Sequence, residues 1–274
     1  MVLCADDYGL TEGVSRGILA LADRGRLSAT SAMATMPAWR AMAPALRERK
    51  ERISAGLHLN LTTGRPLGPM PVLAPGGMFP SLRQILGRAL AGRLAREEVR
   101  DEVERQLDAF ETAFGAPPCF VDGHQHVHVL PVVRQALIGA LRARGLAGSC
   151  WVRDPSDRVG AILKRRLSAG KALTVAALAG GFRRDLREAG FEANEGFSGF
   201  SPLDASTDPA LVFERALTAL GPRPVVMCHP GHADADLRDL DPAVESRERE
   251  LAYLGSDAFA ALLARHGAVL AVAP

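Results

Sequence analysis

Residues 2–9 read Val-Leu-Cys-Ala-Asp-Asp-Tyr-Gly. The apolar start of this stretch predicts a short strand that ends in a cluster of polar residues. After it, Val14, Ile18 and Leu21 have the spacing of a helix with one apolar face, and Thr11 can cap the first turn. A strand that leads directly into a helix is the repeating unit of parallel α/β folds.

The same alternation continues to the end of the chain. Further short apolar runs predict strands within residues 29–36, 53–61, 119–129, 149–153, 225–228 and 268–272. Helical stretches lie between them, and residues 157–189 predict two helices that break near Gly170. The pattern therefore predicts one α/β domain over residues 1–274. We expect a distorted (β/α) TIM-like barrel of parallel strands with flanking helices, since this number of strands in one domain fits a barrel better than a doubly wound sheet.

The composition narrows the class of protein. The chain has 274 residues, of which 47% are hydrophobic, as expected for a globular protein. Its 33 basic and 31 acidic side chains give a net charge of only +2, which offers no general attraction to nucleic acid or anionic membranes. We find no targeting segment and no apolar run long enough to span a bilayer. Four cysteines without a C-x-x-C pair predict reduced thiols, and we expect a cytoplasmic protein.

Four polar clusters follow predicted strands, and six of the seven histidines lie within or beside them. The clusters are Asp6-Asp7, His58, the stretch Asp-Gly-His-Gln-His-Val-His at residues 122–128, and His229. Because the carboxyl ends of the strands of a parallel barrel meet on one face, we expect these side chains to converge there. Packing alone does not place histidines at strand ends, so the pattern favours a metal site or a catalytic site.

The residue types indicate which chemistry such a site can perform. In an extended backbone, His124, His126 and His128 would point the same way. Asp6 and Asp7 can cap the following helix, or one carboxylate can bind a divalent ion while the other acts as a base. An Asp-His-His site leaves positions for water and substrate, and a bound ion lowers the pKa of water. The chain has no G-x-S-x-G, G-x-G-x-x-G or P-loop motif, which disfavours serine hydrolase, dinucleotide and P-loop functions.

Taken together, these motifs resemble those of the YdjC-like carbohydrate deacetylases, the ChbG/HpnK group. The resemblance rests on four motifs in the family's order: Ala-Asp-Asp-Tyr-Gly at residues 5–9, Gly-Leu-His-Leu-Asn-Leu-Thr at 56–62, residues 122–128, and Cys-His-Pro at 228–230. It implies a distorted (β/α) barrel and a metal-dependent enzyme that removes the acetyl group from an N-acetylated amino sugar.

The resemblance also implies roles for individual residues. Asp7, His58 and His124 match the metal ligands of the family, which would hold one divalent ion, Mg²⁺ or Zn²⁺. Asp6 matches the general base, and His229 matches a histidine suited to act as general acid.

Four further residues are expected to contribute to substrate binding: Tyr8, Asn60, His126 and His128. The partner is then an acetylated amino-sugar oligosaccharide or glycolipid, and a homo-oligomer is the default expectation. Two alternatives stay open at this point: a metal-assisted hydrolase of another amide or ester, and a catalytically silent sugar-binding protein. Intact Asp6 and His229 argue against the second, because binding alone needs neither a base nor an acid.

Overall fold

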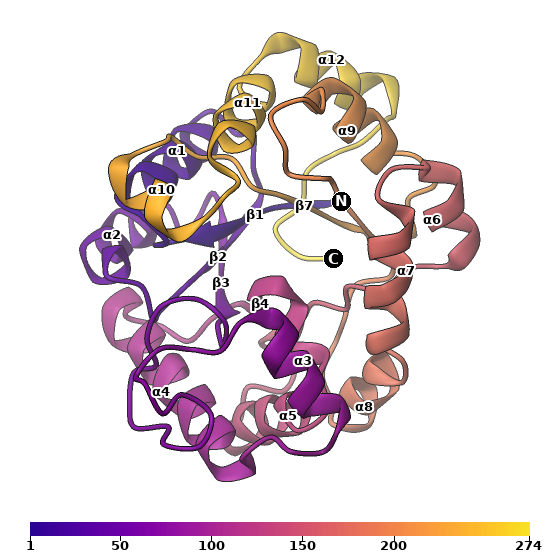
Figure 1. Ribbon diagram of the computed structural model, residues 1–274. Helices are drawn as coiled ribbons and strands as arrows, with labels where there is room; N and C mark the ends of the chain where they lie inside the picture. The colour runs from indigo at the N-terminus through magenta and orange to yellow at the C-terminus, as the bar shows by residue number, and fades with distance from the viewer.

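The computed structural model describes residues 1–274 and has a curled parallel sheet at its centre (Figure 1). The strands lie in the order β5-β4-β3-β2-β1-β7-β6, and every neighbouring pair is parallel. They are β1 (Val2–Tyr8), β2 (Ala29–Ala32), β3 (Ser54–Leu59), β4 (Phe120–Gly123), β5 (Trp151–Val152), β6 (Phe197–Ser198) and β7 (Val225–Cys228). The prediction of a distorted barrel of parallel strands is confirmed.

One irregular segment links the two edges of the curled sheet. Val152 of β5 forms a parallel bridge with Ala193, and its N–H donates to the Glu192 carbonyl at 2.9 Å. A few residues later, the Gly196 carbonyl accepts the N–H of Val225 in β7 at 3.0 Å. Backbone hydrogen bonds therefore run around the whole barrel, although β5 and β6 are only two residues long.

Helices surround the sheet on its outer side (Figure 1). They are α1 (Glu12–Asp23), α2 (Ala38–Arg47), α3 (Leu82–Leu90), α4 (Arg96–Phe114), α5 (Val133–Ala143), α6 (Val159–Arg165), α7 (Ala169–Leu178), α8 (Phe182–Glu188), α9 (Pro209–Ala216), α10 (Ala235–Leu240), α11 (Val244–Leu254) and α12 (Asp257–Arg265). Thr11 caps α1 as expected, since its side chain accepts the Val14 N–H at 3.2 Å. None of these helices is long and apolar enough to cross a membrane.

Two predicted elements differ from the structure. Residues 157–189 form three helices, α6, α7 and α8, and not two. Residues 268–272 form no strand. They are mostly exposed, and the Ala271 N–H donates to the carbonyl of Met1, the residue before β1, at 2.9 Å. Because β1 is already paired with β2 and β7, it has no free edge for another strand.

The packing of β1 sets the position of the acids at its end. Leu3 and Ala5 belong to the large apolar cluster between sheet and helices, whereas Val2 and Cys4 belong to a second cluster that fills the barrel interior. Since side chains alternate along a strand, Asp6 continues the inward-facing set. The apolar interior therefore ends where the acidic residues begin.

Candidate metal centre

Asp6 and Asp7 are neighbours on β1, yet both line the same cavity. Strict alternation would send them to opposite faces of the sheet. The pairing of β1 with β2 shifts register between Ala5 and Tyr8, and Asp7 has a φ of 70°, in the left-handed region. This local irregularity turns both carboxylates inward. A non-glycine residue held in that region is typical of functional sites.

The pairing of β3 with β4 places His58 directly beside Asp122. The Nδ1 atom of His58 lies 2.6 Å from Asp122 Oδ1 and 3.0 Å from the Ser31 hydroxyl. Its other nitrogen, Nε2, lies 3.2 Å from Asp7 Oδ1. A carboxylate that binds one ring nitrogen of a histidine fixes the ring and leaves the other nitrogen available to a metal ion.

His124 reaches the same oxygen from a different element. Strand β4 ends at Gly123, and residues His124–Val129 form a 3-10 helix in which Gln125 and His126 have φ values of 52° and 61°. This helix passes so close to Gly123 that a Cβ atom there would lie 2.8 Å from the Nδ1 of His128. The Nδ1 of His124 lies 3.0 Å from Asp7 Oδ1.

The prediction that His124, His126 and His128 point one way is therefore wrong, because the backbone is coiled there and not extended. The three imidazoles diverge. His124 faces Asp7, His126 lines the cavity against the rings of Phe197 and Phe200, and His128 lies 2.9 Å from the Arg153 carbonyl through its Nε2.

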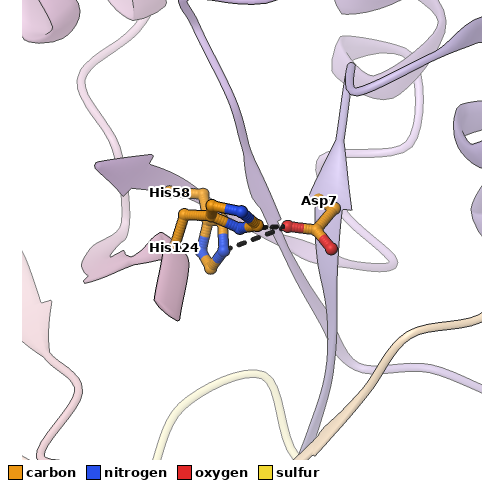
Figure 2. A group of neighbouring side chains, drawn as sticks. All are labelled: Asp7, His58 and His124. Atoms are coloured by element: carbon orange, nitrogen blue, oxygen red, sulfur yellow. Dashed lines mark hydrogen bonds and ion pairs between the residues drawn. The ribbon is translucent and has the colours of Figure 1, made fainter. Parts of the chain in front are cut away.

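Asp7, His58 and His124 form a compact donor set (Figure 2). Their candidate ligand atoms all lie within 4.8 Å of one another. Both imidazoles face Asp7 Oδ1, whereas Asp7 Oδ2 is 2.6 Å from the Nη2 of the buried Arg247. One carboxylate oxygen and two imidazole nitrogens suit a divalent transition ion such as Zn²⁺, and they leave room for further ligands. The residues thus fit the metal site expected from the sequence.

Asp6 lines the same cavity as this donor set, but its carboxylate is bound by Arg153. The Nη1 and Nη2 atoms of Arg153 each donate to one of its carboxylate oxygens at 2.7 Å. Arg153 is fully buried, and its Nη2 also lies 2.6 Å from Asp122 Oδ2. Burial by itself would raise the pKa of Asp6, but the guanidinium outweighs it and lowers that pKa well below its usual value. Asp6 is therefore ionised and held in one orientation.

His229 follows β7 and lines the cavity. Its backbone N–H donates to Glu250 Oε2 at 2.7 Å, and its Nδ1 is buried without a partner. Burial lowers the pKa of His229 to about 4, although the carboxylates of Asp7 and Asp6 oppose that shift. The cost of burying the charged imidazole is therefore larger than the attraction of the acids, and His229 is held neutral at rest.

Three of the four residues expected to bind substrate are fully buried and make hydrogen bonds to groups inside the protein. Tyr8 is fully buried, its hydroxyl donates to the Met42 carbonyl at 2.7 Å, and its ring packs against Trp39. Asn60 is fully buried: its Nδ2 donates to the Thr35 hydroxyl, which follows β2, and to the Thr63 carbonyl, and its Oδ1 accepts the N–H groups of Thr62 and Thr63. Neither side chain lines the cavity, and the polar atoms of both are satisfied inside the protein.

The other two are histidines with different environments. His128 is fully buried between the Arg153 carbonyl and the ring of Phe182, and it does not line the cavity. His126 lines the cavity, and burial lowers its pKa well below the usual value. Of the four, only His126 is placed to meet a ligand.

The cavity has a volume of about 400 Å³, within the range usual for small-molecule sites. Its polar lining includes Asp6, Asp7, His58, His124 and His229. The residues that the sequence placed in four separate clusters therefore do converge on one cavity.

Sequence reasoning missed the partners of the acids. Arg153 directly follows the carboxyl end of the short strand β5, as the four polar clusters follow other strands. It also begins a basic stretch, however, and such a stretch is typical of a solvated surface. Arg247 and Glu250 lie in the charged sequence of α11, where nothing distinguishes them from exposed neighbours. All three are buried, and only the fold shows it.

Comparison with known proteins finds relatives that are named as carbohydrate or chitooligosaccharide deacetylases. A carbohydrate deacetylase of Mus musculus is 35% identical over 181 residues, which cover 60% of this chain and 58% of the relative. A chitooligosaccharide deacetylase of Serratia marcescens is 36% identical over 148 residues, which cover 53% of this chain and 57% of the relative. The chain thus spans 57–58% of the length of these curated relatives.

Among solved structures, a protein of Enterococcus faecalis, provisionally named for cellobiose-phosphate cleavage, superimposes with a TM-score of 0.74. The match covers 98% of this chain and 95% of that one at 20% identity, and it supports the fold. The sequence model of the YdjC-like proteins matches residues 1–265, nearly the whole chain. The four motifs, the fold and this match agree: the chain belongs to the family of YdjC-like proteins.

Proposed function

We propose that this chain is a metal-dependent hydrolase that removes the acetyl group from an N-acetylated amino sugar. The observation that carries the proposal is the donor set of Asp7, His58 and His124 in the same cavity as a second, separately held carboxylate, Asp6. The names of the relatives from mouse and Serratia marcescens support an acetylated sugar as substrate.

In this proposal Asp7, His58 and His124 would hold one divalent ion through the atoms that face one another, Asp7 Oδ1, His58 Nε2 and His124 Nδ1. When bound, the ion supplies Lewis-acid chemistry, which polarises the acetyl carbonyl and makes water more acidic. Imidazole ligands favour Zn²⁺ over Mg²⁺, which prefers oxygen ligands. Asp122 and Arg247 hold His58 and Asp7 in place.

The remaining residues of the site move protons. Asp6, kept ionised by Arg153, accepts a proton from the water whose oxygen adds to the carbonyl carbon. The carbon–nitrogen bond then breaks, and the leaving nitrogen needs a proton. His229 is neutral at rest, so Asp6 returns the proton through this imidazole, which lines the same cavity, and His229 passes it to the amine. The products are acetate and the free amino sugar.

We propose that the enzyme works in the cytoplasm, because all four of its cysteines are free thiols, as in a reducing compartment. Cys4, Cys150 and Cys228 are buried and unpaired, and Cys119 is exposed and unpaired. Disulfides are rare where glutathione and thioredoxin keep thiols reduced.

Release of acetate from N-acetylglucosamine and N,N′-diacetylchitobiose tests the proposal. The protein is loaded with Zn²⁺, Mg²⁺, Mn²⁺ or Co²⁺, and a chelated sample serves as the blank. We expect metal-dependent acetate release. A metal-loaded, folded protein that releases no acetate from simple or alkylated N-acetylglucosaminides, while cleaving another amide or an ester, would overturn the proposed substrate.

A further inference from the structure

Cys119 and Cys150 occupy matching positions on two neighbouring strands, at the end of the barrel away from the metal centre. In the pairing of β4 with β5, Phe120 lies opposite Trp151, and their rings stack with centroids 4.5 Å apart. The two cysteines directly precede this pair in the sequence. The Trp151 N–H donates to the Cys119 carbonyl at 3.2 Å, so the two strands are still hydrogen-bonded where the cysteines lie.

The two thiols lie on the same face of the sheet. Phe120 and Trp151 belong to the apolar cluster inside the barrel, whereas Cys150 belongs to the cluster between sheet and helices. Because side chains alternate along a strand, Cys119 projects to the same outer face as Cys150. Burial raises the pKa of the Cys150 thiol to about 12, and the nearby Cys119 adds to that shift.

The spacing of the two positions suits a covalent bond between their sulfur atoms. Neighbouring strands lie about 4.8 Å apart, and cysteines that form a disulfide have Cα atoms roughly 4.4–6.8 Å apart. In-register side chains on one face also point in the same direction. Rotation of the side chains can therefore bring the two sulfur atoms together without a change in the order or register of the strands.

The other two cysteines also lie on neighbouring strands, but they are out of register. Cys4 of β1 lies opposite Met227, and Cys228 of β7 lies opposite Ala5. Cys4 belongs to the cluster inside the barrel and Cys228 to the cluster outside it, so the backbone of the sheet separates their side chains. Both are buried. This pair is therefore an internal comparison for the first.

We propose that Cys119 and Cys150 form a reversible disulfide by exchange with a low-molecular-weight disulfide such as oxidised glutathione. Cys119 is exposed, so its thiolate attacks first, and a mixed disulfide forms as one small thiolate leaves. Cys150 then loses its proton and attacks the Cys119 sulfur, and the second small thiolate leaves. The protein thiols lose two electrons, the small disulfide gains them, and the two protons end on the released thiols.

The bond would close residues 119–150 into a loop that contains β4, the 3-10 helix with His124, and α5. Such a loop restricts the unfolded chain and thereby stabilises the fold. It joins the amino ends of the strands, whereas Asp122 and His124 lie at the carboxyl end of β4, so metal binding should be unaffected. In a reducing compartment the bond forms only when the thiol pool is oxidised.

Oxidation of the folded protein tests the proposal. The full chain is incubated with excess oxidised glutathione, its free thiols are blocked with N-ethylmaleimide, and a digest is analysed by mass spectrometry without reduction. We expect the intact mass, measured before blocking, to fall by two hydrogens and the digest to contain a peptide pair that joins Cys119 to Cys150. Dithiothreitol should reverse both changes, and the oxidised protein should unfold at a higher denaturant concentration than the reduced protein.

Three variants identify the thiols and their order of attack. Cys150→Ser should stop at a stable glutathione adduct on Cys119, and Cys119→Ser should form neither adduct nor cross-link. Cys228→Ser, the matched control at a buried cysteine on another strand, should form the cross-link as the wild type does.

Three results in the folded wild type would overturn the proposal. The first is a protein that stays fully reduced, and the second is one that stops at a glutathione adduct on Cys119. The third is a cross-link between Cys4 and Cys228 in place of the expected one. Circular dichroism shows whether the protein is folded when it is oxidised.

Discussion

Arg153 and Asp6 form a bidentate ion pair inside the barrel, with both nitrogen–oxygen distances at 2.7 Å. Arg153 also lies against Asp122, which in turn holds His58. One buried guanidinium therefore fixes the proposed base and supports a metal ligand at the same time. The order of the strands explains this link, because β1 and β5 are distant in the sheet but face one another across the curled barrel.

Replacing Arg153 should destabilise the fold. In Arg153→Met, the carboxylates of Asp6 and Asp122 lose their counter-charge while they stay buried, and we expect a loss of about 3–5 kcal/mol in the free energy of unfolding. Arg153→Lys keeps the charge without the bidentate geometry and should lose less. Denaturant titration measures both, with the exposed Arg184→Met as control. Wild-type stability in Arg153→Met would refute the structural role of the pair.

Asp122 should control metal affinity without touching the ion. Asp122→Asn weakens the hold on His58 Nδ1, and changes of this kind typically cost about 10–100-fold in metal affinity or activity. Competition with a chelating dye gives the Zn²⁺ affinity of the variant and of the wild type. Equal affinities in two folded proteins would show that Asp122 does not orient His58.

Asp6 should matter for turnover and not for metal binding. Asp6→Asn keeps the size of the side chain but removes the proton acceptor, and loss of a general base lowers kcat by about 10²–10⁴-fold. Zn²⁺ affinity should stay close to that of the wild type. Asp101→Asn on the exposed face of α4 is the control for loss of a carboxylate. A wild-type kcat in Asp6→Asn would rule out Asp6 as the base.

Glu250 should make stability fall as the pH rises. Burial raises the pKa of Glu250 from 4.5 to about 7, against the attraction of Arg247, while Asp6 adds to the shift. The folded state thus holds this proton more tightly than the unfolded state, so its stabilising effect is complete below pH 4.5 and is lost as the pH passes 7. A difference of about 2.5 pKa units corresponds to about 3 kcal/mol.

Glu250→Gln isolates that effect, because the amide oxygen can still accept the His229 N–H. We expect the free energy of unfolding of the wild type to fall from pH 5 to pH 8 by about 2.5 kcal/mol more than that of the variant, since part of the effect is already lost at pH 5. Denaturant titration at both values measures it. Parallel pH profiles for the two proteins would contradict a raised pKa at Glu250.

The alternation of apolar runs and amphipathic helices was enough to predict the barrel, because both periods are set by local geometry. The convergence of Asp6, Asp7, His58, His124 and His229 on one cavity could likewise be predicted, since all lie at or just after the carboxyl ends of parallel strands. Residues 268–272 misled the prediction, because an apolar run does not reveal whether a sheet has a free edge for it.

Residue contacts that depend on backbone irregularity or on distant elements could not be predicted. The left-handed Gln125 and His126 redirect the three histidines, and no local pattern shows that this stretch coils. Arg247 comes from a helix whose sequence is typical of an exposed face. Tyr8 directly follows the acids in the sequence, but its side chain turns into the core. Such roles follow from tertiary packing alone.

Titration of Zn²⁺ into metal-free protein tests the central claim most directly, with stoichiometry measured by calorimetry and elemental analysis. We predict that the wild type and the surface variant His266→Ala each bind one ion per chain at the proposed site. His58→Ala and His124→Ala, shown to be folded by circular dichroism, should lose that ion. If both variants still bind one ion with the affinity of the wild type, these histidines are not the ligands and the account of the site is wrong.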